Sequence, residues 1–177
     1  MPETAPTPSL PPIDPAAVQK TFLAVLTKPA EFYPTVKAEQ GFQKVLLFSV
    51  IMGVIYGALG AVASILYLHS VIAAIIAIIV GGISGLLAPF IGGAIVFVVC
   101  MLFGSKAPFE SSVKVAGYAS AIYPLYGLAA LVGIVPLLPM LVQLVVGLYG
   151  LYICYIGAKA LNFDPAVAAP PAAPPVS

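Results

Sequence analysis

The sequence has little charge of either sign, and it contains no arginine. Only 7% of its 177 residues are charged, whereas an average soluble domain carries about 25%. The basic residues are all lysines and are scattered along the chain, whereas a nucleic-acid-binding surface needs them clustered on one face. These shortages exclude an ordinary soluble domain and a nucleic-acid partner.

Cysteines and catalytic motifs are also scarce. The two cysteines, Cys100 and Cys154, lie inside apolar runs, and their spacing indicates neither a disulfide framework nor a metal site. The sequence contains no phosphate-binding loop, no zinc-protease motif and no nucleophile elbow, and no Asp or Glu lies inside an apolar run. We therefore expect a protein that is not an enzyme and that needs no cofactor or metal.

Apolar residues are abundant, at 62% of the chain, and the mean hydropathy is +1.12. A membrane-spanning helix needs about 20 such residues. Between residues 45 and 158, the ionisable side chains of the His, Lys, Asp and Glu types are His69, Lys106, Glu110 and Lys114. The sequence therefore predicts an all-α, polytopic integral membrane protein, a helical bundle whose partner is the lipid bilayer.

The two ends of the chain differ in composition from its middle. Residues 1–14 are rich in proline and residues 163–177 in alanine and proline, which predicts disordered tails. Residues 15–41 predict two short cytoplasmic helices, the first amphipathic and capped by Asp14. These helices pack on the mouth of the bundle, lie in the lipid headgroup region, or do both.

Residues 42–162 form the predicted transmembrane domain. Its four expected spans are residues 42–68, 84–103, 112–132 and 140–161, and Pro124 should kink the third. The long apolar stretch 71–103 is interrupted by glycines and Pro89, so we interpret residues 71–80 as a half-length segment before the second span. The alternative is two thin crossings joined at Gly81–Gly82, which gives five spans.

The lysines favour four spans, because positively charged residues gather on the cytoplasmic side. With four spans every lysine and both termini lie inside, whereas five spans place Lys106 and Lys114 outside. Small residues one turn apart let membrane helices approach closely. The candidate packing glycines, which serve either contacts within the chain or a homo-oligomer, are Gly53, Gly57, Gly60, Gly147 and Gly150.

Two groups of polar side chains are candidates for function. Glu110 and Lys114 are one helical turn apart and form either a gate or partner contact at the cytoplasmic face, or a solvated helix end. Six tyrosines on the third and fourth expected spans either line a polar cavity with Gln143 or bond between helices; they are Tyr118, Tyr123, Tyr126, Tyr149, Tyr152 and Tyr155.

The segment 103–124, FGSKAPFESSVKVAGYASAIYP, has a glycine turn, a short lysine-containing stretch and a helix that opens Val-x-x-Tyr-Ala before a proline. The residues that carry this pattern are Gly104, Lys106, Phe109, Val115, Tyr118, Ala119 and Pro124. The pattern resembles the Yip family of multispanning membrane proteins, whose eukaryotic members are named for interaction with Ypt/Rab small GTPases. The short chain and small loops are similar to those of prokaryotic members.

This resemblance implies a multi-pass protein of a prokaryotic inner (cytoplasmic) membrane with a cytoplasmic N-terminus. It also implies a scaffold or an interaction or trafficking protein, with a protein partner at the cytoplasmic face. The candidate contact or gate residues are Lys106, Phe109, Glu110, Lys114 and Tyr118. The alternative function is a subunit of a small oligomeric channel or transporter, because interrupted membrane helices often border binding sites.

Overall fold

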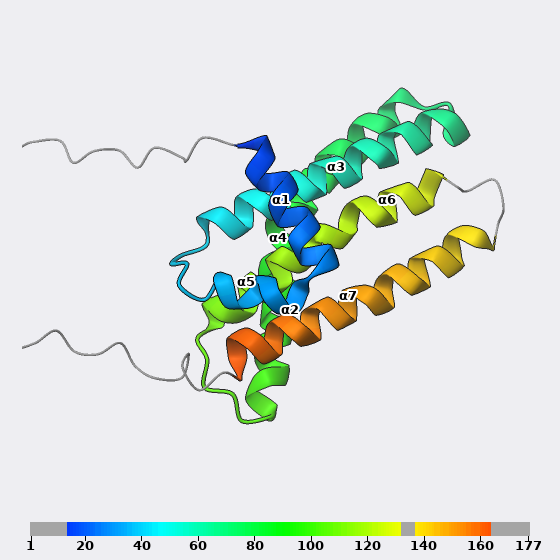
Figure 1. The fold of residues 1–177 in the computed structure, drawn as a ribbon. Helices are drawn as coiled ribbons and strands as arrows, with labels where there is room; N and C mark the ends of the chain where they lie inside the picture. Colours follow the sequence, from blue (N-terminus) through cyan, green and yellow to red (C-terminus); the bar gives the residue numbers. More distant parts are fainter. Residues whose placement is uncertain (1–13, 132–136, 164–177) are drawn as a thin grey trace, which may run out of the picture.

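The computed structural model describes residues 14–131 and 137–163, and these residues form helices joined by short connections (Figure 1). The predicted tails, 1–14 and 163–177, lie outside the described residues except for Asp14 and Phe163. In chain order the elements are α1 (Pro15–Thr27), α2 (Pro29–Thr35), α3 (Gln43–Leu68), α4 (Val71–Leu102), α5 (Phe109–Ala119), the 3₁₀ turn η1 (Ser120–Ile122), α6 (Tyr123–Leu131) and α7 (Leu138–Asn162). The all-α prediction is confirmed.

Three helices of the described residues, α3, α4 and α7, are long and apolar enough to cross a membrane. The first and last expected spans, 42–68 and 140–161, coincide with α3 and α7 to within two residues. Much of the surface of these helices is apolar and exposed, as at Leu66, Ile91 and Leu151, which are 57%, 61% and 68% exposed. Such an apolar surface is suited to contact with the acyl chains of a lipid bilayer.

The interpretation of residues 71–103 as a half-length segment followed by a separate span is wrong, and so is the alternative of two thin crossings. Residues 71–102 form one continuous 32-residue helix, α4, that passes through Gly81–Gly82 and Pro89. A helix break in lipid would leave backbone groups without hydrogen-bond partners. The glycines do not end the helix; Gly81 and Gly85 face α3, and Gly93 faces Val113 of α5.

The α3–α4 hairpin is held together by glycines on both helices, and it is the most extensive contact between elements. A methyl group added at Gly53 would lie 2.8 Å from the Cα of Gly85, and one at Gly57 would lie 2.6 Å from the Ala77 carbonyl oxygen. At Gly60 it would lie at an ordinary 3.6 Å from Ala77. Gly53 and Gly57 therefore pack within the chain, whereas Gly60 is not required to be glycine.

The third expected span, 112–132, is divided into α5, η1 and α6. The break lies just before Pro124, where a kink was predicted. Proline has no N–H, so the Ser120 carbonyl cannot receive its usual helical bond from residue 124, and it accepts instead from Tyr123 in a 3₁₀ turn. α5 lies at the centre of the molecule, with most of its residues buried and contacts to α3, α4 and α7.

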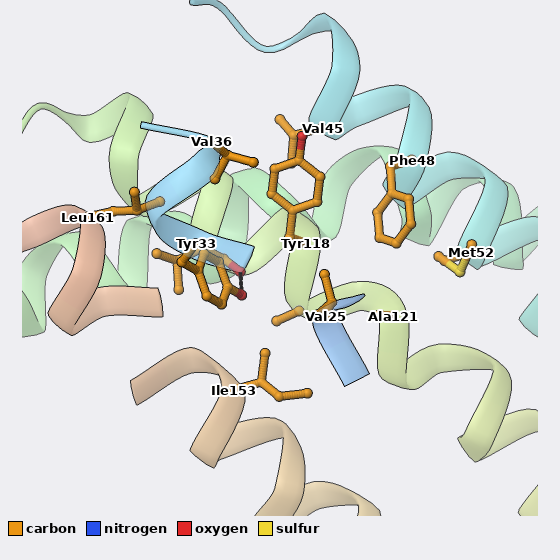
Figure 2. Close-up of a cluster of buried hydrophobic side chains, with 12 residues drawn as sticks. Val25, Tyr33, Val36, Val45, Phe48, Met52, Tyr118, Ala121, Ile153 and Leu161 are labelled. Atoms are coloured by element: carbon orange, nitrogen blue, oxygen red, sulfur yellow. Dashed lines mark hydrogen bonds between the residues drawn. The ribbon is translucent and has the colours of Figure 1, made fainter. Parts of the chain in front are cut away.

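The two N-terminal helices pack on the bundle. Asp14 caps α1 as predicted, its carboxylate accepting from the Ala16 N–H at 3.0 Å. Val25 of α1 and Tyr33 of α2 are fully buried in a cluster shared with α3, α5 and α7 (Figure 2). The predicted packing of these helices on the bundle is therefore present.

The lysine-bearing ends of the helices meet at one end of the bundle. The Gly41 N–H before α3 donates to Glu110 of α5 at 2.9 Å. Ser105, just after α4, donates to the Asn162 carbonyl at the end of α7 at 2.5 Å. His69 and Ser70 form the α3–α4 turn at the far end of α3, with His69 in the left-handed conformation at a φ of 50°.

Candidate functional site

A cluster of charged and phenolic side chains joins the connection between α2 and α3 to the central helix α5. We call it the Lys114 cluster, and its members are Glu39, Lys44, Glu110, Lys114 and Tyr118. The connection brings Glu39 over α5 because Gly41 turns the chain at a φ of +75°, a left-handed conformation that glycine adopts without strain.

Lys114 is the most buried charge in this cluster, with 7% of its side chain exposed. Its ammonium lies 2.8 Å from Glu110 Oε1 and donates to the Glu39 backbone carbonyl. A buried ammonium is tolerated only when its charge is paired and its protons are bonded. A solvated helix end was one of the two interpretations of Glu110 and Lys114 from the sequence. It does not describe Lys114, whose side chain is enclosed by the chain.

Tyr118 connects the cluster to the apolar core. Its hydroxyl donates to Glu39 Oε2 at 2.7 Å. Its ring lies edge-on to Phe32 of α2, with ring centres 4.9 Å apart, and against Phe48 of α3 at 5.5 Å. Figure 2 shows the Tyr118 ring between α2 and α3. Tyr118 thus contacts both Glu39 of the α2–α3 connection and Phe32 of α2.

The Lys114 cluster acts as a clasp. Both Glu39 oxygens are engaged, one by Tyr118 and the other by Lys44 at 3.3 Å. Glu110 accepts from the Gly41 N–H and pairs with Lys114, so the ammonium has two oxygen partners within the chain, Glu110 and the Glu39 carbonyl. Bonds of this kind to a charged group stabilise a fold by about 1.5–3 kcal/mol each when they are sheltered from water.

The structure brings together three of the five predicted contact residues. Glu110, Lys114 and Tyr118 lie in the cluster, whereas Lys106 is exposed in the α4–α5 connection and the Phe109 ring packs on Phe97 at 5.6 Å. Sequence reasoning missed Glu39. Its signal was an acidic residue two positions before Gly41 in a chain with so few acids.

Tyr33 fastens α2 between α5 and α7. Its side chain is fully buried, and its hydroxyl donates to the Val115 carbonyl of α5 at 3.3 Å. Burial raises the pKa of this hydroxyl well above its usual value, so it stays a neutral donor. The ring lies over Gly157 of α7, where an added methyl would be 2.6 Å from Tyr33 Cζ.

A groove of about 410 Å³ lies on α1 and α2. Lys28 and Glu31 lie at it as an exposed ion pair, 3.1 Å apart. The lining residues are Lys20, Thr21, Ala24, Lys28, Glu31, Phe32 and Thr35. Because Val25 and Tyr33 fasten α1 and α2 to the bundle, the groove lies on a fixed surface.

The other candidate residues are distributed along α7. A methyl at Gly150 would lie 2.5 Å from Ile122, and one at Gly147 would lie 3.1 Å from the Tyr126 hydroxyl, so both face η1 and α6. Cys154 and Cys100 are free thiols. In the residues that the structure describes, no three His, Cys, Asp or Glu side chains are grouped so that they could hold a metal ion.

Long apolar helices with lipid-suited surfaces and a charged clasp at one end define a polytopic helical membrane protein. The family model of the Yip1 domain matches residues 23–176. The chain belongs to the Yip1 domain family and is an integral membrane protein, as the resemblance implied. No curated protein and no solved structure matches it.

Proposed function

We propose that this chain is a non-enzymatic scaffold or interaction protein of the membrane, which presents the α1–α2 groove to a protein partner at the cytoplasmic face. The observation that carries the proposal is the fastening of α1 and α2 to the bundle, with their groove left open. Binding to a fixed surface costs less conformational entropy than binding to a surface that must first become ordered.

The proposal includes four crossings, with α5, η1 and α6 together as the third. Residues 109–131 extend about 34 Å at 1.5 Å per residue, which suffices for a hydrocarbon core of about 30 Å. The hydrogen bonds Gly41–Glu110 and Ser105–Asn162 support it, since they bring the start of α3, the end of α4, the start of α5 and the end of α7 together. Lysine bias makes this end cytoplasmic.

The membrane proposed is a prokaryotic inner (cytoplasmic) membrane with the N-terminus inside. Connections as short as the two-residue α3–α4 turn support the prokaryotic assignment. In such a cell the partner of the groove is a protein of the cytoplasm or of the same membrane.

Photo-crosslinking tests the proposed docking surface. A benzophenone amino acid replaces Ala24, which lines the groove, or Ile95, an exposed residue of α4 that does not line it. Irradiation of intact cells should give a discrete protein adduct at position 24 and only lipid adducts at position 95. Protein adducts of equal yield at both positions, or none at position 24, would contradict the proposal.

Reconstituted vesicles test the non-enzymatic part. The purified protein should carry no flux of common ions or metabolites and turn over no lipid. The channel alternative rested on an interrupted second span, and α4 is continuous over residues 71–102. A flux of ions or metabolites that depends on this protein would nevertheless contradict the proposed scaffold function.

A further inference from the structure

A second pocket, of about 340 Å³, lies between the long helices, away from the Lys114 cluster. Its lining residues are Tyr56 of α3, Ser84 of α4, Tyr123, Tyr126 and Ala130 of α6, and Gln143 of α7. The rings of Tyr56 and Tyr123 are tilted by 52° to each other, with their centres 6.1 Å apart. Of the six tyrosines considered as lining a cavity with Gln143, Tyr123 and Tyr126 line this pocket, whereas Tyr56 was not among the six. Tyr149 lies outside the pocket and donates to the Leu26 carbonyl.

The pocket lies at the depth of the hydrocarbon core. Tyr56 is near the middle of the 26-residue α3, and Ser84 is near the middle of the 32-residue α4. Tyr56 itself is 39% exposed, and the residues next in sequence to Tyr56, Ser84 and Gln143, which are Ile55, Ile83 and Leu144, are apolar and exposed. The pocket therefore borders the acyl chains, and a guest reaches it sideways from the bilayer.

The polar groups of the pocket are unusual for this depth. In the described part of the chain, the side chains of Tyr123, Tyr126 and Gln143 make no hydrogen bond to another protein group, nor do those of Tyr56 and Ser84. A polar group without a partner is costly in hydrocarbon. Four hydroxyls and an amide in one pocket are therefore poised to bond a guest that supplies oxygen atoms.

The charge of the guest follows from what lines the pocket. The lining residues include no Asp, Glu, Lys or His, and the charges of the Lys114 cluster are paired with one another outside the pocket. An ion bound here would lose its water without gaining a counter-charge, which is prohibitive in low dielectric. The guest must be uncharged.

We propose that this pocket binds the uncharged, oxygen-bearing head of a neutral lipid of the diacylglycerol type, while its acyl chains stay in the bilayer. The head carries one hydroxyl and two ester carbonyls, which match the hydroxyl and amide donors of the pocket. A volume of about 340 Å³ is at the lower end of small-molecule sites, about 300–1,000 Å³, and suits a head without its chains.

The test uses the full-length protein in phosphatidylcholine nanodiscs with a diazirine-bearing diacylglycerol as the probe. Irradiation followed by peptide mapping should place the label on α3, α6 or α7 at the pocket. Unlabelled dioleoylglycerol should displace the probe, and dioleoylphosphatidic acid, which has the same chains but a charged head, should not.

Two kinds of variant separate binding from folding. Y126F/Q143L removes donors and should weaken labelling roughly tenfold, the effect of losing two hydrogen bonds. Ala130→Phe fills the pocket and should abolish labelling without removing a polar group. The control is Tyr152→Phe, an exposed tyrosine of α7 outside the pocket, which should label as the parent does.

Labelling that is unchanged in both pocket variants, or that phosphatidic acid displaces equally, overturns the proposal. The proposal is also overturned if the diacylglycerol probe labels the pocket no more than a probe that has acyl chains and no polar head, since the pocket then holds only water. If one pocket variant no longer elutes as a single monodisperse species, it has lost its fold, and the labelling of the other pocket variant decides the test. The groove on α1 and α2 is untouched by these changes, so the outcome is independent of the proposed scaffold.

Discussion

Two lysine–glutamate pairs of this chain have similar geometry and different surroundings. Lys114 and Glu110 are 7% and 34% exposed, whereas Lys28 and Glu31 are 64% and 71% exposed. Water and salt screen the second pair, and exposed pairs contribute little to stability. The first pair is sheltered, so removal of one partner leaves a buried charge.

We expect Glu110→Gln to destabilise the folded protein by roughly 2 kcal/mol, because the Lys114 ammonium then keeps only neutral partners. E110Q/K114M should recover much of this loss, since no charge remains buried. The matched control, Glu31→Gln, should change little. The measurement is the apparent midpoint of thermal unfolding in detergent, and equal shifts for Glu110→Gln and Glu31→Gln would contradict the clasp.

Only part of this cluster was predictable from sequence. The i, i+4 spacing of Glu110 and Lys114 fixes their pairing, because a helix places such residues on one face. Spacing along the chain carries no information on Glu39, which reaches Tyr118 from 79 positions away. That contact depends on how the loop after α2 folds over α5.

At the scale of helices, glycines decide how closely the backbones approach. Gly57 and Gly60 are both on α3, but only Gly57 faces backbone atoms of α4 at a distance that excludes a methyl group. Overpacking a tight contact costs about 1–3 kcal/mol. An alanine in an open helical position is instead favourable by up to about 1 kcal/mol.

Gly57→Ala should therefore destabilise the protein by roughly 2 kcal/mol as α3 and α4 are pushed apart. Gly60→Ala should be neutral or slightly stabilising, and it is the matched control because it makes the same change one turn away. Chemical unfolding of the two variants in mixed micelles distinguishes them. Equal stabilities would mean that α3 and α4 do not pack through Gly57.

The contact between α2 and α7 gives a second prediction for helices. Gly157→Ala should displace the Tyr33 ring and detach α2, because the methyl would overlap the ring. Trypsin should then cleave after Lys20 and Lys37 faster than in the parent. Gly82→Ala, whose methyl meets only Val54 at 3.6 Å, should leave the cleavage rate unchanged.

A smaller side chain at position 33 tests whether overlap with the Tyr33 ring is the reason why α2 detaches in Gly157→Ala. Y33L/G157A should be cleaved more slowly than Gly157→Ala alone, because leucine leaves room for the methyl. If the double variant is cleaved as fast as the single one, steric overlap with Tyr33 is not the reason for detachment.

The sequence predicted the helices better than their partners. The limits of α3 and α7 followed from apolar length, and Pro124 located the break before α6. The glycines of α4 were misinterpreted, because Gly81 and Gly85 look alike whether they break a helix or face a close neighbour. Sequence periodicity does not say what lies opposite a glycine, which requires the position of α3.

For the whole molecule, the proposed four crossings predict on which side of the membrane each connection lies. In a Cys100→Ala, Cys154→Ala background, Lys106→Cys should react with an impermeant maleimide only when the cytoplasmic face is exposed. His69→Cys should react only from the opposite face, since His69 lies in the turn at the far end of α3. Labelling of both positions from the same face would indicate an even number of crossings between them and would contradict a single crossing by α4.

The continuous α4 also determines which membranes suit this protein. Its 32 residues extend about 48 Å, whereas a hydrocarbon core is about 30 Å thick. The helix is locked to α3, so it must lean strongly or stretch the surrounding lipid. Hydrophobic mismatch of this size favours thicker regions of a bilayer, so lipid thickness would sort the protein laterally before any partner is met.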